Sequence, residues 1–349
     1  MCFAIAAYAA YSKNENIRLQ SSSGAIFTLF AENVIHENGA VYGVAMTDDC
    51  YEASFFRITD IDSLAKLRGS KYLQAKLGDT YIQVKNDLEK GLSVLFSGTG
   101  CQVNGLKAFL GREYDNLFCI DVICHGTPSP ALWRKYVRHM EDKNESKLIH
   151  VNFRCKDSSW NDFGMKEIDE HSNEVYISKD IDPYMQMFLR DYCLRPSCYK
   201  CIAKDKKCSD ISIADFWGIE SVAPEMCDGK GTSLILVRTK KGKKAFEQIN
   251  DKIVMKTVSY EDAVKGNPAE YRSAKRPEQR DTFFIDMKMM DFSELKQKYV
   301  VKIQVPLKRR IKNAIKKIAL QTPFRRLLGG VKCSGNYGLL FVWQTKGAG

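Results

Sequence analysis

The sequence predicts an α/β fold with a mixed, largely parallel sheet and flanking helices, followed by a basic helical C-terminal tail. Three observations support this prediction. Short apolar runs alternate with helical runs over residues 93–140, and such alternation favours parallel strands joined by right-handed crossovers. The 349 residues are 44% hydrophobic and 27% charged, as in an ordinary globular protein. The positive charge is concentrated at the C-terminal end of the chain.

The first third of the chain predicts both strands and helices. SSSG at 21–24 forms a serine-rich turn before a helix, in which Ile26, Phe30 and Val34 share one face. The apolar runs AVYGVAMT and EASFFRIT predict two strands. Residues 60–75 predict a helix that runs into a loop, and residues 81–91 predict a second helix.

Two strand–loop–helix units follow in the middle of the chain. The first has a strand at 93–97, a loop at 98–102 and a helix at 103–111. The second has a strand at 116–123, a loop at 124–130 and a helix at 131–141. Loops that follow parallel strands gather at one sheet edge, where ligands bind. Cys101 and Cys124 lie in these two loops, so we expect them to face each other across that edge.

Residues 1–294 are expected to form one domain and residues 295–349 a basic amphipathic tail. Strands are predicted at 148–155, 173–178 and 231–239, and helices at 182–194 and 240–249. The tail has thirteen Lys or Arg and no Asp or Glu, which leaves −2 of the net charge of +11 for residues 1–294. A nearly neutral body argues against specific nucleic-acid binding.

The tail also predicts a basic amphipathic helix at 307–318. Leu307, Ile311, Ile315 and Ile318 fall on one face of this helix, with Lys and Arg elsewhere. It could lie on an anionic membrane surface or dock on the body as a charged helix. We expect a cytoplasmic protein, because no basic segment precedes the apolar start and no run is long enough to span a membrane. A peripheral position at the inner face of the membrane is the alternative.

The twelve cysteines point to a metal centre or to buried thiols, because disulfides are rare in the cytoplasm. Cys198 and Cys201 form a C-x-x-C pair, whose thiolates can reach one metal centre. Together with Cys101 and Cys124 they make a four-thiolate site the best interpretation. Soft thiolates select iron–sulfur clusters or zinc, and both remain open at this point.

The remaining cysteines have simpler explanations. Cys119 lies in an apolar strand and is expected in the core, since free cysteine packs like a small hydrophobe. Cys193 is expected to pack in the same way within a helix. Cys208 is close to the C-x-x-C pair but also fits a surface position.

Three short motifs could bind phosphate. SSSG offers hydroxyl and backbone N–H groups at a helix start, although a plain serine cap explains it somewhat better. RGSKY at 68–72 and the glycine turn at 98–100 could bind phosphate in the same way. Alternatively, RGSKY is a glycine stop at the C-terminal end of a helix, and the second motif is a plain turn. Together they suggest a large phosphorylated cofactor, bound by Ser22, Ser23, Gly24, Ser70, Lys71, Tyr72, Gly98 and Thr99. His125 could relay protons near neutral pH or make a structural hydrogen bond.

Several blocks in order resemble the beta subunits of coenzyme F420 hydrogenases and dehydrogenases, over residues 3–290. The blocks are SSSGAIF, VYGVAM, RGSKYLQ, VLFSGTGCQVNGLKAFL, NLFCIDVICHGTPSP, RPSCYKC and SDISIADFWG. The resemblance implies an oxidoreductase that binds FAD and a 4Fe-4S cluster and exchanges a hydride with coenzyme F420 or another substrate. It implies Cys101, Cys124, Cys198 and Cys201 as cluster ligands, and the flavin against the three phosphate motifs.

Three departures from the family pattern bear on these expectations. The family's GTPCQ is GTGCQ here, and Gly100 in place of proline loosens the turn that holds Cys101. Many relatives begin with a ferredoxin-like module that this chain lacks, so a separate ferredoxin-like redox partner is expected. The family's SSSGG is SSSGA here, and Ala25 adds a methyl group near the expected phosphates. The alternative from another functional class is a zinc-stabilised binding protein, associated with membranes or nucleic acid, without redox turnover.

Overall fold

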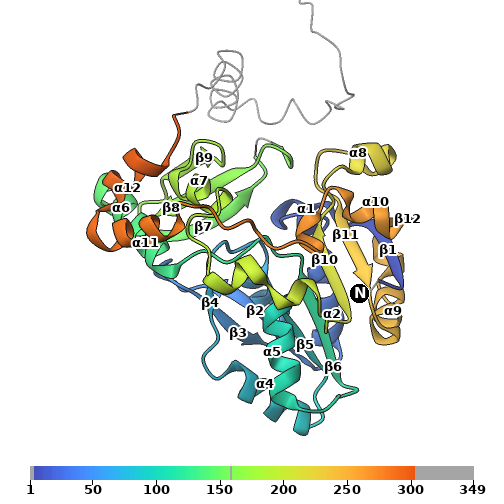
Figure 1. Ribbon diagram of the computed structural model, residues 1–349. Helices are drawn as coiled ribbons and strands as arrows, with labels where there is room; N and C mark the ends of the chain where they lie inside the picture. The colour runs from blue at the N-terminus through green and yellow to red at the C-terminus, as the bar shows by residue number, and fades with distance from the viewer. Residues whose placement is uncertain (1–3, 158, 303–349) are drawn as a thin grey trace, which may run out of the picture. The chain divides into compact units, whose positions relative to one another are not determined.

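The computed structural model of the protein describes residues 4–157 and 159–302. Its centre is a nine-stranded mixed sheet with the order β12-β1-β11-β10-β6-β5-β2-β3-β4 (Figure 1). The central strands β10, β6, β5 and β2 run parallel to one another, which confirms the predicted fold class. The strands are β1 (Ala6–Ser12), β2 (Ala40–Met46), β3 (Ala53–Ile58), β4 (Ala75–Lys76), β5 (Val94–Thr99), β6 (Leu117–Val122), β10 (Ile211–Asp215), β11 (Ser233–Val237) and β12 (Ile253–Val258).

Helices cover both faces of this sheet because its strands alternate between two apolar cores. In β5, Val94 and Phe96 pack with α4 and α5, whereas Leu95 packs on the opposite face with α2, α3 and α9. This is the two-residue period of a strand buried on both sides. The helices around the sheet are α1 (Glu15–Gln20), α2 (Ile26–His36), α3 (Ile61–Leu67), α4 (Thr80–Glu89), α5 (Gly100–Leu110), α8 (Ile219–Val222), α9 (Lys240–Glu247) and α10 (Tyr260–Lys265).

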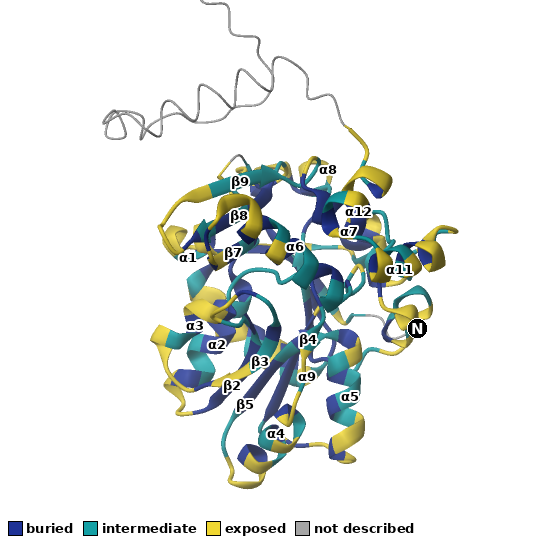
Figure 2. Ribbon diagram, turned by 90° about the vertical axis from the view of Figure 1, so that its left-hand side faces the viewer, coloured by how far each residue is buried: buried dark blue, intermediate teal, exposed yellow. Residues whose placement is uncertain are grey.

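A second, smaller core lies around a three-stranded antiparallel sheet. The large side chains Trp133, Tyr136 and Tyr184 fill it and are fully buried. Figure 2 shows the burial of each residue along the chain, with buried residues in dark blue. Its elements are β7 (Leu148–Cys155), β8 (Gly164–Asp169), β9 (Glu174–Ser178), α6 (Pro130–Asn144), α7 (Pro183–Leu189), α11 (Arg280–Met289) and α12 (Phe292–Tyr299). Short 3-10 turns span Pro196–Lys200 (η1), Ile202–Lys204 (η2), Pro224–Met226 (η3), Asn250–Lys252 (η4) and Pro268–Glu270 (η5).

The structure corrects three local predictions. Cys101 lies in the first turn of α5 and not in a loop, because a capping box between Thr99 and Gln102 starts the helix at Gly100. The residue at the N-cap of α2 is Ala25, in the left-handed conformation, and no serine side chain caps this helix. Cys193 is buried, as expected, but in the turn after α7 and not in a helix.

The sequence pattern also missed several strands, among them β1 and β8. β1 is rich in alanine, a poor strand former, and it becomes a strand by pairing with β11 and β12. The domain boundary expected at 294/295 falls within α12, whose Phe292, Leu295 and Tyr299 are buried. The amphipathic helix predicted at 307–318 lies outside the described residues. Among the described residues, none of the helices is long and apolar enough to cross a membrane.

Candidate functional site

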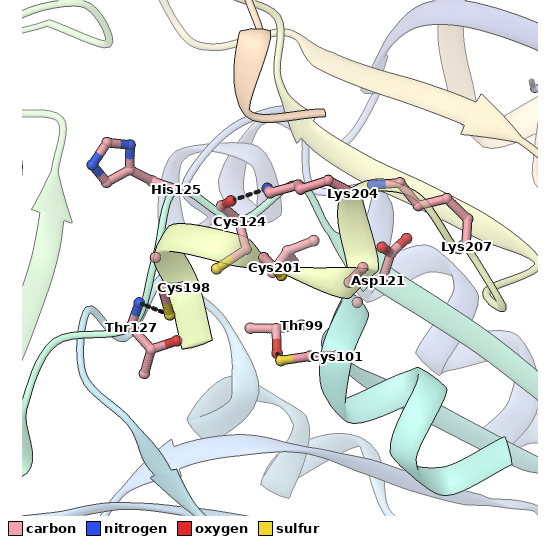
Figure 3. A pocket seen from close by; sticks show the side chains of 14 residues that line it. Thr99, Cys101, Asp121, Cys124, His125, Thr127, Cys198, Cys201, Lys204 and Lys207 are labelled. Carbon is pink, nitrogen blue, oxygen red and sulfur yellow. Dashed lines mark hydrogen bonds between the residues drawn. The ribbon is translucent and has the colours of Figure 1, made fainter. Parts of the chain in front are cut away.

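Four cysteines from three parts of the chain line one small pocket of about 30 Å³. Because β5 and β6 are parallel and Thr99 pairs with Val122, the two strands end side by side. Cys101 then follows β5 in the first turn of α5, and Cys124 follows β6. Cys198 lies in η1 and Cys201 directly after it. Figure 3 shows the four side chains around this pocket.

Backbone hydrogen bonds hold the C-x-x-C turn against the loop after β6. The Arg195 N–H donates to the Thr127 carbonyl at 2.9 Å, and the Ser129 N–H donates to the Cys193 carbonyl at 2.9 Å. The Thr127 N–H also donates to the Cys198 sulfur at 3.4 Å. These contacts join segments about 70 residues apart in sequence, and they place η1 over the ends of β5 and β6.

The thiols are close enough to influence one another electrostatically. Burial raises the pKa of the Cys124 thiol to about 12, the Lys204 ammonium lowers it, and the thiols of Cys198 and Cys101 raise it further. Burial also raises the pKa of Cys198, which the Thr127 N–H lowers and Cys101 and Cys201 raise. The mutual effects show that the four sulfur atoms share one environment. Binding of a cation would offset the cost of ionising them together.

The surroundings of the thiols differ in polarity. The Thr99 hydroxyl lies 3.2 Å from the Cys101 sulfur, and Cys101 is exposed, whereas Cys124, Cys198 and Cys201 are half-buried. The Lys204 ammonium donates to the Cys124 carbonyl at 2.6 Å. Within the described part of the chain, no three His, Cys, Asp or Glu side chains are placed to hold a single metal ion. The thiols therefore surround a pocket and do not meet at a point.

His125 lies at the rim of this pocket, and its ring points away from the sulfur atoms (Figure 3). Its Nε2 is 2.6 Å from a carboxylate oxygen of Asp191, and its ring packs edge-on against Phe188. The histidine therefore makes a structural hydrogen bond, although to a residue outside its own loop. It also lines a second cavity, so the proton-relay interpretation stays a prediction.

The second cavity is much larger, about 880 Å³, and it adjoins the cysteine pocket. Thr99, Val122, Cys124, His125, Gly126 and Thr127 line both. Its floor is the edge of the main sheet where the parallel strands end, as is usual for ligand sites in α/β folds. Its opposite wall includes side chains from the smaller core, among them Arg154, Phe163 and Phe188.

The three predicted phosphate motifs meet in this large cavity. The Ser22 hydroxyl accepts a hydrogen bond from the Ser70 N–H at 2.9 Å and lies 3.0 Å from the Ser70 hydroxyl. Tyr72 packs against Phe188, with ring centroids 5.2 Å apart. The residues of the prediction that line the cavity are Ser22, Ser23, Ser70, Lys71, Tyr72, Gly98 and Thr99.

A serine hydroxyl and a lysine in this cavity are withdrawn from water. The buried Ser23 hydroxyl has no hydrogen-bond partner among the described residues. Burial lowers the pKa of Lys71 to about 7, although the residue is half-buried overall and its ammonium donates to the Arg68 carbonyl at 2.6 Å. An anion at this wall would satisfy the hydroxyl and favour the charged lysine.

Gly24 does not line the cavity and has a packing role. Its N–H donates to the Ser233 hydroxyl at 2.9 Å. A Cβ at this position would come within 2.4 Å of the Ala10 carbonyl oxygen, so only glycine lets the turn approach β1 this closely.

The sequence pattern missed several residues on the far wall of the cavity. Arg154 lies in β7 with a buried side chain, next to Phe163 and Trp217. The segment 266–275 also borders the cavity. A single arginine between the apolar residues of a predicted strand was the one signal for Arg154 in the sequence, because such residues are rarely buried without a partner.

Comparison with known proteins gives a family and a structure of similar fold. A family model for the C-terminal part of the coenzyme F420 hydrogenase/dehydrogenase beta chain matches residues 91–263, and the corresponding N-terminal model matches residues 7–80. Among solved structures, a chain of the F420-reducing NiFe hydrogenase complex from Methanosarcina barkeri is similar in fold. It is 14% identical, with a TM-score of 0.51, over 77% of this chain and 86% of that chain. A search of curated proteins gave no match. The chain belongs to the family of coenzyme F420 hydrogenase/dehydrogenase beta subunits.

Proposed function

We propose that the protein is an iron–sulfur flavoprotein oxidoreductase. It would pass electrons between a 4Fe-4S cluster at the four cysteines, FAD in the large cavity, and coenzyme F420 or another hydride-accepting substrate. The observation that carries the proposal is the shared wall of the two pockets. Both the cysteine pocket and the large cavity are lined by Thr99, Val122 and residues 124–127. Groups bound on the two sides of this wall would therefore be neighbours.

The donor set fits a cluster. Four cysteine thiolates are the usual ligands of a 4Fe-4S cluster, and here they come from a helix start, a strand end and a C-x-x-C turn. The N–H of Thr127 and the hydroxyl of Thr99 contact two of the sulfur atoms. Hydrogen bonds of this kind tune the potential of such a centre.

The cavity wall fits the phosphates of a dinucleotide. The start of α2 provides backbone N–H groups and the positive end of a helix dipole. The unpartnered Ser23 hydroxyl and the desolvated Lys71 lie on the same wall. When bound, FAD supplies two-electron chemistry with hydride donors or acceptors and one-electron exchange with a cluster. The protein residues would orient it and separate it from water.

The cysteine pocket also offers a route for electrons from a redox partner. Cys101 is exposed, and the C-x-x-C turn is followed by an exposed Ile202. Around it lie three exposed basic residues, Arg195, Lys200 and Lys206, and one exposed acid, Asp205. A basic rim with an apolar centre suits an acidic partner. A ferredoxin-like protein is the kind of partner that we propose.

The test is anaerobic purification of the full chain, followed by an absorption spectrum and assays for iron, sulfide, zinc and flavin. We expect about four irons and one flavin per chain. The substitution Cys198→Ser should reduce the iron content strongly, because it removes one of the four thiolates. The matched control is Cys208→Ser, since Cys208 lies in the same segment but lines neither cavity.

Three results would count against the proposal. Zinc as the only metal would favour the zinc-stabilised binding protein. Cluster and flavin both missing would mean that the fold persists without redox chemistry. Equal iron loss in the Cys198 and Cys208 variants would show that general destabilisation, and not loss of a ligand, explains the effect.

A further inference from the structure

A lysine lies in the wall between the two pockets. Lys204 is the last residue of η2 and lines the cysteine pocket. Its ammonium donates to the Cys124 carbonyl at 2.6 Å (Figure 3) and also to the Ala269 carbonyl. Both of these residues line the large cavity, so the ammonium lies where the two pockets adjoin. Among the described residues, no carboxylate forms an ion pair with it.

The other charged side chains on this side of the cysteine pocket have partners. Lys207 also lines the pocket, and its Nζ lies 3.2 Å from a carboxylate oxygen of Glu270. Glu270 in turn lies 2.6 Å from Arg238, and all three side chains are at most 6% exposed. Asp121, the acid of the pocket, accepts hydrogen bonds from two serine hydroxyls. In the part of the chain that the structure describes, Lys204 is therefore the lysine of this pocket whose charge no carboxylate balances directly.

The ammonium of Lys204 acts on the charge of the thiols. It lowers the pKa of Cys124, against the larger opposite effect of burial. Conversely, burial lowers the pKa of Lys204, whereas the thiols of Cys124 and Cys201 raise it. The cation and these two sulfur atoms therefore attract each other when the sulfur atoms are charged. Because Lys204 is half-buried, water screens this attraction less than it would at the surface.

The position of this charge is fixed by contacts between distant segments. The two carbonyls that bind the Lys204 ammonium belong to residues 80 and 65 positions away in sequence. Cys201 is fixed to the same region, because its N–H donates to the Ser273 hydroxyl at 3.0 Å. The ammonium is thus held at one place relative to the cysteines, and no rearrangement is needed when charge develops there.

A fixed cation favours the more negative of two states of a neighbouring centre. An iron–sulfur cluster gains one negative charge when it takes up an electron, and net charge and hydrogen bonds are among the features that set its potential. A lysine that no carboxylate balances, in the lining of the cysteine pocket, is placed to act on this equilibrium.

We propose that Lys204 raises the reduction potential of the cluster at the four cysteines by stabilising the reduced form. This inference rests on the proposed function for the presence of the cluster. One electron enters the cluster from a reduced ferredoxin-like partner, which is oxidised, while Lys204 gains and loses neither electron nor proton. Lys204 is thus a positioning residue that acts through the cluster.

The test measures the midpoint potential of the cluster in the full chain, purified anaerobically with its cofactors. Titanium(III) citrate with mediator dyes reduces the protein in steps, and electron paramagnetic resonance detects the reduced cluster by its own signal. Lys204→Gln removes the charge but keeps an amide that can donate to the carbonyls, and Lys204→Met removes both. In both variants we expect the ratio of reduced to oxidised cluster at a given potential to fall about tenfold, which is about 59 mV for a one-electron couple.

Two further variants separate charge from packing. Lys204→Arg keeps the charge and should change this ratio less than about threefold. Lys206→Met is the matched control, because it removes the same charge from an exposed side chain two residues away that lines neither pocket. Its effect should also be less than about threefold, since water and salt screen an exposed charge. No protein partner is present in this titration, so the charge of the docking rim does not enter.

The outcomes separate this inference from the proposed function. An unchanged potential in both neutral Lys204 variants would overturn the inference, and the proposed function would stand. An equal fall in Lys204→Arg or in Lys206→Met would also overturn it, because the position of the charge would then not explain the shift. Loss of iron from both neutral variants while they remain folded would leave Lys204 a purely structural role and overturn the inference as well. An unmodified protein without a cluster would overturn the proposed function and the inference together.

Discussion

At the residue scale, the smaller core contains two carboxyl groups on either side of one tyrosine. The Tyr136 hydroxyl lies 2.5 Å from an oxygen of Glu167 and 3.0 Å from an oxygen of Asp182. The second oxygen of Glu167 has no hydrogen-bond partner among the described residues. Burial raises the pKa of Glu167 to about 7 and that of Asp182 to about 6. The folded protein therefore holds protons here that the unfolded chain would release.

Glu167 predicts a specific pH dependence of stability. Its pKa is higher in the folded than in the unfolded protein. The contribution of Glu167 to the free energy of unfolding is therefore largest below about pH 4.5, and it is lost as the pH rises through about 7. Glu167→Gln should therefore be more stable than the unmodified protein at pH 8, by about 1–3 kcal/mol, and nearly equal at pH 5. Urea unfolding at several pH values measures this difference.

The control for this experiment is Glu174→Gln on the neighbouring strand, because that side chain is more than half exposed. It should leave the pH profile unchanged. If the free energy of unfolding of Glu167→Gln falls with rising pH as steeply as that of the unmodified protein, the Glu167 carboxyl does not retain its proton.

At the element scale, the start of α2 combines a tight approach with an unusual backbone. Gly24 packs against Ala10, and Ala25 follows with φ 68°. An L-residue in this left-handed conformation costs about 1–2 kcal/mol relative to the right-handed one. Glycine at this position would carry no such cost. Ala25 lines the large cavity, so its methyl group is not enclosed on all sides.

Ala25→Gly should therefore lower the free energy of unfolding by less than about 0.5 kcal/mol, or raise it. The reason is that glycine relieves the backbone strain, which offsets the lost methyl contacts. Ala31→Gly, in the interior of the same helix and fully buried, should lose about 1–2 kcal/mol. Urea unfolding of both variants makes the comparison. Similar losses in the two variants would contradict the left-handed assignment of Ala25.

At the scale of the whole molecule, the two pockets open in different ways. The cysteine pocket has an exposed thiol and a basic rim, whereas the large cavity lies between the main sheet and the smaller core. This arrangement would let a protein partner dock at the cluster while a small substrate occupies the cavity. Electrostatic attraction at such a rim acts mainly on the association rate and weakens with salt.

The rim predicts a salt-dependent reaction with an acidic ferredoxin. Lys200→Glu/Lys206→Glu should slow its second-order electron transfer to the bound flavin about tenfold or more at low ionic strength, and much less in high salt. Stopped-flow absorbance measures this rate. Lys85→Glu/Lys90→Glu, in the middle of α4 and at its C-cap and outside both pockets, reverses the same charge and should have little effect. Equal slowing by both pairs would indicate a general charge effect and exclude docking at this rim.

Local patterns were sufficient for the central part of the fold. The alternating runs at 93–140 predicted β5, β6 and α6, and their spacing placed Cys101 and Cys124 at one sheet edge, where the structure has them. Cys119 was expected in the core and is fully buried. These predictions succeeded because hydrophobic periodicity and strand-to-strand connection are properties of neighbouring residues.

The sequence by itself determined the α/β class, the family and the four cysteines that line one pocket. Only the tertiary structure decided that Gly24 has a packing role and that Arg154 borders the same cavity as Ser23. The physical reason is that each of these depends on contacts between distant segments. Arg154 lies beside Trp217 and Asp215, more than 60 residues further along the chain. No local period records such a contact, since only the packing of the smaller core over the main sheet creates it.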